Sequence, residues 1–398
     1  MPRWSELKGL ISLRRPAFGR DARLARAVTI WDLRDMGRRR TPRAVFDYVD
    51  GAAEGEITMA RSREDFANLE FSPSVLRDVA SVDTTTTVLG AESSFPFGLA
   101  PTGFTRMMHH EGEVGAARAA GRHGLVYTLS TLGTTSTTTL GEQARDTNKW
   151  FQLYLPDDRG LARDLLTEAR AAGFSALALT VDTPVPGIRL RDHRNGLAFP
   201  PALTPRTLAG MARHPRWWFN VLSHEPLGFA SFGSHAGSMP ELLNSLWDPS
   251  LDTADLEWVR AEWDLPLVIK GIQRADDAGI AFELGADAVI VSNHGGRQLD
   301  RSTTTLRLLP GVVAAHGDKG EIFMDGGITS GADIVAAIAL GASHCFVGRS
   351  YLYGLMAGGE AGVDRALTIL ESEVRRTMQL LGAASVADLH PGMVGHRS

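Results

Sequence analysis

Eight short apolar runs alternate with helical stretches through most of the chain, and this alternation constrains the fold more than any other feature. The runs read FPFGLA, GLVYTLS, KWFQLYL, ALALTV, PLVIKGI, AVIVSN, EIFMDGG and HCFVGRS. Parallel strands buried on both faces have continuous apolar sequences of this kind, and helices supply the crossovers between them. Helical patterns over 111 to 123, 159 to 173, 275 to 285 and 331 to 341 fit the gaps. We therefore predict an α/β fold, a (β/α)8 TIM barrel.

Two segments lie outside this repeat. Residues 1–28 carry scattered arginines and are predicted to form a solvated N-terminal arm, followed by one domain over residues 29–398. Helical signals begin at Thr29 and again after Pro42, which predicts a helical segment before the barrel.

A long inserted connection, residues 187 to 256, separates the fourth and fifth strands. It contains two groups of residues of note, Pro200, Pro201 and Pro205, and Trp217, Trp218 and Phe219. Connections of this length in compact barrels are usually functional. The aromatic residues could pack on the barrel wall, form a lid over the active site, or touch a membrane interface, and we favour packing.

Composition narrows the class of partner. The formal net charge of -5 argues against nucleic acid, which calls for a basic excess. Cys345 is the sole cysteine, so neither an intrachain disulfide nor a multi-thiol metal site can form, and no metal is expected. The first residues lack the apolar core of a signal peptide. These observations favour a cytoplasmic protein that acts on a small molecule.

Polar residues gather where five of the predicted strands end. In a (β/α)8 barrel these ends form the active face. Acidic, basic and cationic groups that converge on one barrel mouth are typical of a catalytic site. The residues concerned are Gln152, Tyr154, Thr180, Asp182, Lys270, Ser292, His294, Arg297 and Asp325.

The segment VSNHGGRQLD places His294 and Arg297 just beyond the sixth strand. Histidine suits proton abstraction near neutral pH, and arginine suits fork-like binding of a carboxylate. Gly295 and Gly296 allow the backbone to approach a ligand closely. A purely structural histidine is the alternative, and the neighbouring arginine and glycines make it the weaker one.

Glycines follow the seventh and eighth strands, in MDGGITSG and VGRS. Barrels commonly bind phosphate at these two loops, through backbone N–H groups and a helix N-terminus. Arg349 could neutralise the anion. The pattern predicts a site for a phosphorylated cofactor or substrate.

Taken together, these blocks resemble the FMN-dependent 2-hydroxy acid oxidase and dehydrogenase family over about residues 29 to 390. The block SNHGGRQLD is the most specific, and FDY, APTGF, HHEGE, TLST, WFQLY, LTVDTP, VIKGI, DGGI, ALGA and VGR occur in order around it. Within the family, APTGF, HPRWWF and YLYGLMAGGEAGV are most similar to bacterial L-lactate dehydrogenases that pass electrons to quinone or cytochrome.

The resemblance implies roles for the catalytic residues. His294 would be the base that accepts a proton from the substrate, and Asp182 would pair with it, because a nearby carboxylate favours the imidazolium. The residues that would hold the substrate carboxylate and hydroxyl are Arg297, Arg189, Tyr48 and Tyr154.

The resemblance also implies an FMN site. Lys270 would lie at the flavin N1 and O2 edge, where a positive charge stabilises reduced flavin. The remaining residues expected around the ring are Pro101, Thr102, Gly103, Ser130, Gln152, Thr180 and Ser292. Those expected around the ribityl chain and phosphate are Asp325, Gly326, Gly327, Gly348 and Arg349.

Four positions depart from the commoner family pattern. Thr329 replaces an arginine that faces the FMN phosphate in many members, and Ala52 replaces a glycine. Leu132 stands where glycolate oxidase has tryptophan, which argues against a glycolate-tuned pocket. Gly103 stands where oxidases tend to have alanine, which favours a dehydrogenase.

The sequence therefore predicts FMN-dependent oxidation of an L-2-hydroxy acid, with L-lactate as the leading substrate and a quinone or cytochrome as acceptor. Three redox variants stay open: an oxidase that uses O2, an enzyme that acts on mandelate or 4-hydroxymandelate, and an enzyme for another larger 2-hydroxy acid. A non-redox FMN barrel, a catalytically inactive sensor and an NAD-linked enzyme are weaker alternatives. The resemblance implies a homo-oligomer, a tetramer. The long connection suggests peripheral attachment to the inner face of the cell membrane.

Overall fold

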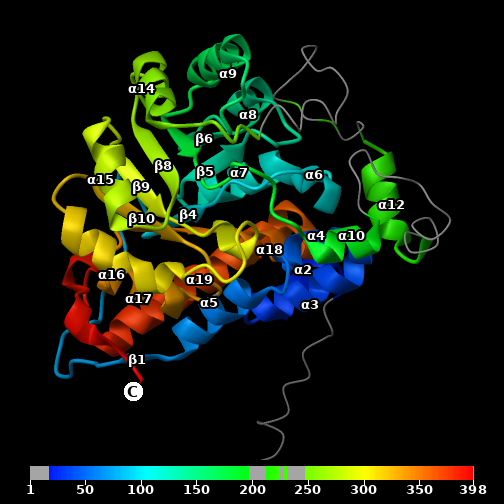
Figure 1. Ribbon diagram of the computed structural model, residues 1–398. Helices are drawn as coiled ribbons and strands as arrows, with labels where there is room; N and C mark the ends of the chain where they lie inside the picture. Colours follow the sequence, from blue (N-terminus) through cyan, green and yellow to red (C-terminus); the bar gives the residue numbers. More distant parts are fainter. Residues whose placement is uncertain (1–17, 197–211, 225–227, 229, 231–246, 398) are drawn as a thin grey trace, which may run out of the picture.

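The predicted barrel is confirmed. The computed structural model describes residues 18–196, 212–224, 228, 230 and 247–397. Eight parallel strands close in the order β10-β11-β4-β5-β6-β7-β8-β9, and each coincides with one apolar run (Figure 1). The strands are β4 Phe97–Leu99, β5 Tyr127–Ser130, β6 Lys149–Leu153, β7 Ala176–Thr180, β8 Leu267–Ile272, β9 Ala288–Val291, β10 Glu321–Asp325 and β11 His344–Val347.

Helices surround the barrel, and the four predicted in the sequence are present: α7 Gly112–Arg122, α9 Arg159–Ala171, α15 Ala275–Glu283 and α17 Gly331–Ala339. The other outer helices are α6 Thr105–Met108, α8 Thr137–Gln143, α14 Thr253–Glu262, α16 Thr305–His316, α18 Arg349–Gly358 and α19 Glu360–Leu381. Before and beside the barrel lie α2 Arg20–Leu24, α3 Ile30–Arg40, α4 Arg43–Asp50, α5 Ile57–Ala67, α10 Leu190–Asn195 and α12 Pro215–Leu222.

The barrel interior is a packed core. The Trp150 ring centroid lies 5.8 Å from that of Phe323 and 5.2 Å from that of Phe346, and small side chains such as Ala176 leave room for them. A hairpin of β2 (Thr86–Val88) and β3 (Ala91–Ser93) contacts this core through Val88. The hairpin also binds the start of β10, because the Leu89 amide donates to Glu321 Oε1 at 2.8 Å. Aromatic rings thus fill the barrel interior, so a ligand can bind only at the ends of the strands and not inside the barrel.

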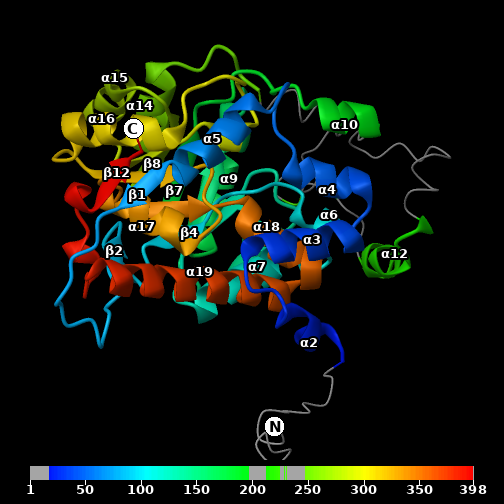
Figure 2. The ribbon, with the colours of Figure 1, turned by 90° about the horizontal axis from the view of Figure 1, so that it is seen from below.

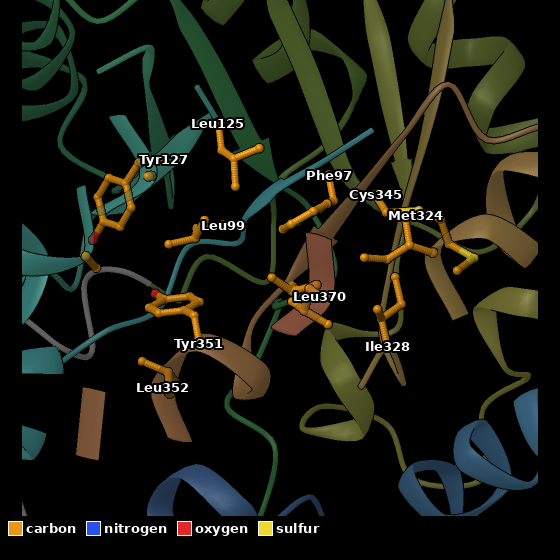
Figure 3. Packing of buried hydrophobic residues seen from close by; sticks show 14 of the residues in the cluster. Phe97, Leu99, Leu125, Tyr127, Met324, Ile328, Cys345, Tyr351, Leu352 and Leu370 are labelled. Atoms are coloured by element: carbon orange, nitrogen blue, oxygen red, sulfur yellow. The ribbon is translucent and has the colours of Figure 1, made fainter. Parts of the chain in front are cut away.

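A second apolar layer joins the strands to the last two barrel helices. Figure 3 shows Tyr351 of α18 and Leu370 of α19 close to Phe97 and Leu99 of β4 and to Cys345 of β11. Cys345 is buried in this layer, and burial raises the pKa of its thiol, as is typical of a cysteine that packs as a small apolar residue.

The N-terminal helices lie beside the C-terminal ones. In α3, the Thr29 hydroxyl accepts from the Asp32 amide while the Asp32 carboxylate accepts from the Thr29 amide, so the predicted helix start is confirmed. Helix α3 packs on α18 (Figures 1 and 2). A short antiparallel pair of β1 (Leu69–Phe71) and β12 (Val394–His396) joins the two halves of the chain once more.

Part of the predicted solvated arm packs on the body of the protein. Leu24 and Ala27 are buried, and Arg23 Nη2 donates to the Ala357 carbonyl of α18 at 3.1 Å. The prediction of a free arm is therefore wrong for residues 20–27. Residues 1–17 lie outside the described part of the chain.

The long connection includes α10 and α12 and continues to α14. Trp217 is buried and its Nε1 donates to the Met107 carbonyl at 2.9 Å, so the packing interpretation is confirmed for this residue. Phe219, by contrast, is 77% exposed. Pro200, Pro201 and Pro205 lie outside the described residues. Among the helices that the structure describes, none combines the length and the apolar character that a membrane crossing requires.

Candidate functional site

A cavity of about 590 Å³ opens at the C-terminal ends of the barrel strands. Its wall also includes residues of α3, α4 and α5, so the N-terminal helices complete the site. All but two of the predicted site residues line it, and the exceptions, Asp182 and Ser292, lie directly behind residues that do. The lining residues are Tyr48, Pro101, Thr102, Gly103, Ser130, Gln152, Tyr154, Thr180, Arg189, Lys270, His294, Arg297, Asp325, Gly326, Gly327, Gly348 and Arg349.

His294 lies between a carboxylate and a phenol. Its Nδ1 is 2.9 Å from Asp182 Oδ1, and its Nε2 is 3.4 Å from the Tyr154 hydroxyl. The Asp182 contact leaves Nε2 as the ring nitrogen on the cavity side, beside Tyr154. A histidine held in this way can accept a proton at Nε2 while the carboxylate stabilises the cation that forms.

The Asp182 carboxylate is ionised despite its burial. Burial by itself would raise the pKa of Asp182, but the His294 ring and the Lys270 ammonium outweigh burial and hold this pKa below its ordinary value. The charged carboxylate holds the His294 ring in place through its contact with Nδ1.

Two guanidinium groups lie against the same aromatic ring. The Cζ atoms of Arg297 and Arg189 lie 5.1 and 5.9 Å from the Tyr48 ring centroid. Arg297 Nη1 donates to the carbonyls of Tyr48 and Gly51, and Arg189 Nε donates to Asp192 Oδ2. Burial, together with repulsion by Arg189, lowers the pKa of Arg297 to about 10. Since this repulsion would be relieved by an anion, the pair is suited to bind a carboxylate.

A buried cation lies at the end of β8. Lys270 Nζ donates to Ser292 Oγ at 2.9 Å and lies 3.1 Å from Asp325 Oδ2. Burial tends to lower the pKa of Lys270, but Asp325 and Asp182 outweigh it and raise the pKa above its ordinary value. The ammonium therefore stays charged on the cavity wall.

Polar side chains at the ends of three neighbouring strands form a continuous chain. Ser130 Oγ of β5 donates to Gln152 Oε1 of β6 at 2.9 Å, and Gln152 Nε2 donates to Thr180 Oγ1 of β7 at 3.0 Å. These hydrogen bonds fix which atoms of Gln152 donate and accept. They provide an ordered polar edge of the kind that a heteroaromatic ring system requires.

The glycine loops after β10 and β11 form the other end of the cavity. Gly326 and Gly327 have φ angles of +93° and +78°, a conformation that favours glycine. At Gly348, an added Cβ atom would lie 4.0 Å from its nearest neighbour, so the backbone is open to the cavity. Gly348 also precedes α18 without any side-chain cap for the helix N-terminus. An open, uncapped helix N-terminus is suited to a phosphate.

Several cavity residues were not identified from the sequence, and three of them bear on the site. Gln298 donates from Nε2 to the carbonyls of Asp182 and Val185, and thereby ties the loops after β7 and β9 together. Trp247 packs on Tyr154 with ring centroids 5.3 Å apart. Arg63 reaches the cavity from α5. Only Gln298 carried a sequence signal, because it directly follows Arg297.

Comparison with known proteins agrees with this geometry. The family described as FMN-dependent dehydrogenase matches residues 37–396. The chain belongs to this family.

Named relatives of the family cover nearly the whole chain. A putative L-lactate dehydrogenase of Mycobacterium tuberculosis is 51% identical over 392 residues, 98% of this chain and 95% of that protein. An L-lactate dehydrogenase of Caulobacter vibrioides is 42% identical over 373 residues, 92% of this chain and 97% of that protein. The crystal structure of the monotopic membrane protein (S)-mandelate dehydrogenase superposes with a TM-score of 0.90 at 35% identity, and covers 93% of this chain and 100% of that one.

The cavity fits the FMN that the family requires. The polar chain through Gln152 and the buried Lys270 ammonium suit the edge of an isoalloxazine ring, and the open backbone at Gly348 suits its phosphate. The protein is therefore an FMN-dependent dehydrogenase that oxidises a 2-hydroxy acid.

Proposed function

We propose that this FMN-dependent dehydrogenase oxidises L-lactate to pyruvate. Support comes from relatives named L-lactate dehydrogenase, which are 40–51% identical to the chain, whereas the solved mandelate dehydrogenases and oxidases are 33–35% identical. The single observation that carries the chemistry is the His294 ring, which lies between Asp182 and Tyr154 in the same cavity as two arginines.

In this proposal His294 is the catalytic base. Its Nε2 takes one proton from the 2-hydroxy acid, and Asp182 stabilises the resulting imidazolium through the 2.9 Å contact at Nδ1. Bound FMN supplies the two-electron oxidant for the reaction. Tyr154 orients the substrate hydroxyl beside His294.

Arg297 and Arg189 bind the substrate carboxylate. The Tyr48 ring lies against both guanidinium groups and holds them close together, and the carbonyls of Tyr48 and Gly51 anchor Arg297. A carboxylate bound between the two guanidinium groups would relieve their mutual repulsion. Relief of this repulsion contributes part of the free energy of substrate binding.

The remaining predicted site residues are proposed to contact the cofactor. Lys270 faces the flavin as a fixed positive charge, and Ser292 and Asp325 hold its ammonium in place. The residues proposed to surround the rest of the cofactor are Pro101, Thr102, Gly103, Ser130, Gln152, Thr180, Gly326, Gly327, Gly348 and Arg349.

For the electron acceptor we propose a quinone or a cytochrome rather than O2. The supporting observation is Gly103 beside the cavity, where oxidases of the family tend to have alanine. We also propose a homotetramer, on the family resemblance. Peripheral attachment to the inner face of the cell membrane is supported by the exposed Phe219 on α12 and by the similar structure described as monotopic.

A second candidate substrate is an aromatic 2-hydroxy acid such as mandelate. It is favoured by the superposition on (S)-mandelate dehydrogenase at a TM-score of 0.90. At the cavity wall, Leu132 and Trp247 offer apolar surface that could contact a phenyl ring.

Anaerobic reduction of the flavin tests both candidates. Purified protein is mixed with L-lactate, D-lactate, glycolate or L-mandelate, and flavin absorbance is followed over time. We expect bleaching to be fastest with L-lactate and absent with D-lactate. Equal or faster bleaching with mandelate would overturn the lactate assignment, and no bleaching with any acid would overturn the proposed reaction. Reoxidation by O2 or by a soluble quinone then identifies the class of acceptor, and light scattering gives the oligomeric state.

A further inference from the structure

We infer that Arg63 of α5 supplies a further cationic side chain, in addition to Arg349, for the FMN phosphate in this protein. Arg63 lies outside the barrel strands and outside the two glycine loops that form the phosphate end of the cavity. Its side chain is 29% exposed, and it lines the same cavity as Gly327, Thr329 and Gly348. The residue therefore reaches the phosphate end from a different layer of the fold.

Three contacts hold the Arg63 guanidinium at this place. Nη1 donates to the Gly327 carbonyl and to Asp333 Oδ2, the latter at 2.7 Å. Its Cζ lies 5.6 Å from the centroid of the Phe66 ring one turn along the helix. A guanidinium fixed on three sides loses little further freedom when it binds an anion, and it offers more than one N–H group at a time.

The other positions at the phosphate end leave a place for a further cation. Position 329 carries a threonine, which has no charge. Arg349 begins α18, but its guanidinium donates to the carbonyls of Val49, Gly51 and Gly295 and is thereby drawn toward α4 and the loop after β9. Arg63 is the cation that contacts the Gly327 loop directly.

Asp333 makes a cation at this place necessary. Its carboxylate caps α17 and accepts from the amides of Thr329 and Ser330 at 2.8 and 3.0 Å, so a negative charge lies directly behind Thr329, which lines the phosphate end of the cavity. An approaching phosphate would be repelled by this carboxylate. Arg63 neutralises Asp333 and attracts the phosphate, and both effects favour FMN over a flavin that lacks phosphate.

The test compares FMN with riboflavin, which differs only by the phosphate. Flavin released on dilution of the holoenzyme is measured by its fluorescence, and the emptied protein is refilled with either flavin. We expect Arg63→Met to raise the dissociation constant for FMN about 10- to 100-fold, as for loss of a charge-assisted hydrogen bond, with riboflavin affinity changed less than about threefold. Arg61→Met is the matched control, because Arg61 is an exposed residue of the same helix; it should leave both constants unchanged.

A second variant separates charge from structure. In Arg63→Met/Thr329→Arg, a guanidinium returns to the phosphate end from the other side, and we expect most of the lost FMN affinity to be restored. If Arg63→Met does not yield folded protein, Arg63→Lys provides the same FMN and riboflavin comparison, with a smaller selective loss for FMN. Equal losses for FMN and riboflavin, or an FMN affinity unchanged from that of Arg61→Met, would overturn the inference.

Discussion

His294 adopts a backbone conformation that few non-glycine residues adopt, with φ at +56°. Such a conformation costs on the order of 1 kcal/mol or more and persists where the surroundings determine it. Here the amide of His294 donates to Ser292 Oγ at 3.1 Å and the ring is held by Asp182, so both the backbone and the side chain are fixed. The conformation aims Nε2 at the cavity and is consistent with a role as base.

His294→Gln is expected to keep the yellow flavin but lose substrate reduction. Glutamine can still hydrogen-bond to Asp182 but cannot accept a proton, so the rate of anaerobic bleaching should fall about 10²- to 10⁴-fold. Stopped-flow absorbance with L-lactate measures this rate. Asp182→Asn, which leaves the ring in place, should cause a smaller fall. Near-normal bleaching by His294→Gln would rule out its role as base.

Arg297→Met is expected to weaken capture of the substrate carboxylate. Loss of one charge-assisted contact should lower kcat/KM for L-lactate by about 10- to 100-fold. Lactamide, which has no carboxylate charge, provides the internal comparison, because its slower turnover should be affected far less. An equal loss for lactate and lactamide would contradict a direct contact between Arg297 and the carboxylate.

The residues of the catalytic half of the site could be predicted from the sequence, because they follow strand ends within recognisable blocks. His294, Arg297 and Lys270 each lie at or just beyond the end of an apolar run, and the barrel brings such ends together. Arg63 and Trp247 could not be predicted in this way. They enter the cavity from a helix before the barrel and from the long connection, and their proximity to the site depends on tertiary packing alone.

At the scale of elements, the loops after β4 and β5 are in close contact. The Phe104 amide donates to the Leu132 carbonyl at 3.0 Å, and a Cβ atom at Gly103 would lie 2.9 Å from Leu132 Cβ. Glycine at 103 is therefore required by the neighbouring loop, and this packing constraint is separate from any preference for an electron acceptor.

Gly103→Ala is expected to destabilise the protein by about 1 to 3 kcal/mol, as for other over-packed sites. Leu132→Gly removes the atom that clashes, so the double variant should be more stable than the sum of the two single effects implies. Thermal unfolding of the four proteins measures the coupling. Strict additivity would show that the Leu132 side chain is not the cause of the destabilisation by Gly103→Ala.

Helices α7 and α19 are joined by a charged cluster around His123. Its Nδ1 lies 2.6 Å from Glu371 Oε1 and its Nε2 lies 3.4 Å from Asp364 Oδ1. Burial alone would lower the pKa of His123, but these two carboxylates outweigh it and raise the pKa from 6.5 to about 9. His123 is therefore protonated in the folded protein at neutral pH.

This pKa gives the cluster a defined pH dependence. Because the folded pKa is the higher one, the stabilisation is complete below pH 6.5 and is lost as pH rises toward 9. Relative to the wild type, His123→Gln should lower the melting temperature by several degrees at pH 6 and by much less at pH 9.5. A difference that does not change with pH would show that the histidine stabilises the helices by packing alone.

The eight strands were predictable, because each is buried on both faces and has a continuous apolar sequence. The pairs β2–β3 and β1–β12 were not predictable, because a strand of three residues is too short to show a recognisable alternation of apolar and polar residues. In addition, β1 pairs with a strand at the far end of the chain. The packing of residues 20–27 was missed for a related reason. Only Leu24 and Ala27 are buried there, too few to give a helical pattern against the surrounding arginines.

At the scale of the whole molecule, the cavity joins distant parts of the chain. Its lining runs from Trp31 of α3 to Tyr353 of α18 and includes residues next to every barrel strand. A ligand that fills it contacts the N-terminal helices and the ends of the barrel strands at the same time. Cofactor binding should therefore stabilise the whole fold rather than one loop.

Removal of FMN is expected to lower the melting temperature of the entire protein. A ligand that binds only the folded state stabilises it by RT ln(1 + [L]/Kd), about 2.7 kcal/mol at 100 times Kd. Without FMN, the buried Lys270 ammonium also loses the flavin edge that it is proposed to face in the cavity. Melting temperature measured against FMN concentration should rise with the logarithm of that concentration, and probes of the barrel and of the N-terminal helices should report the same transition. Riboflavin should give a smaller rise, because it lacks the phosphate. A local transition in the N-terminal helices alone, with an unchanged barrel transition, would show that the cofactor orders only the wall formed by α3 to α5.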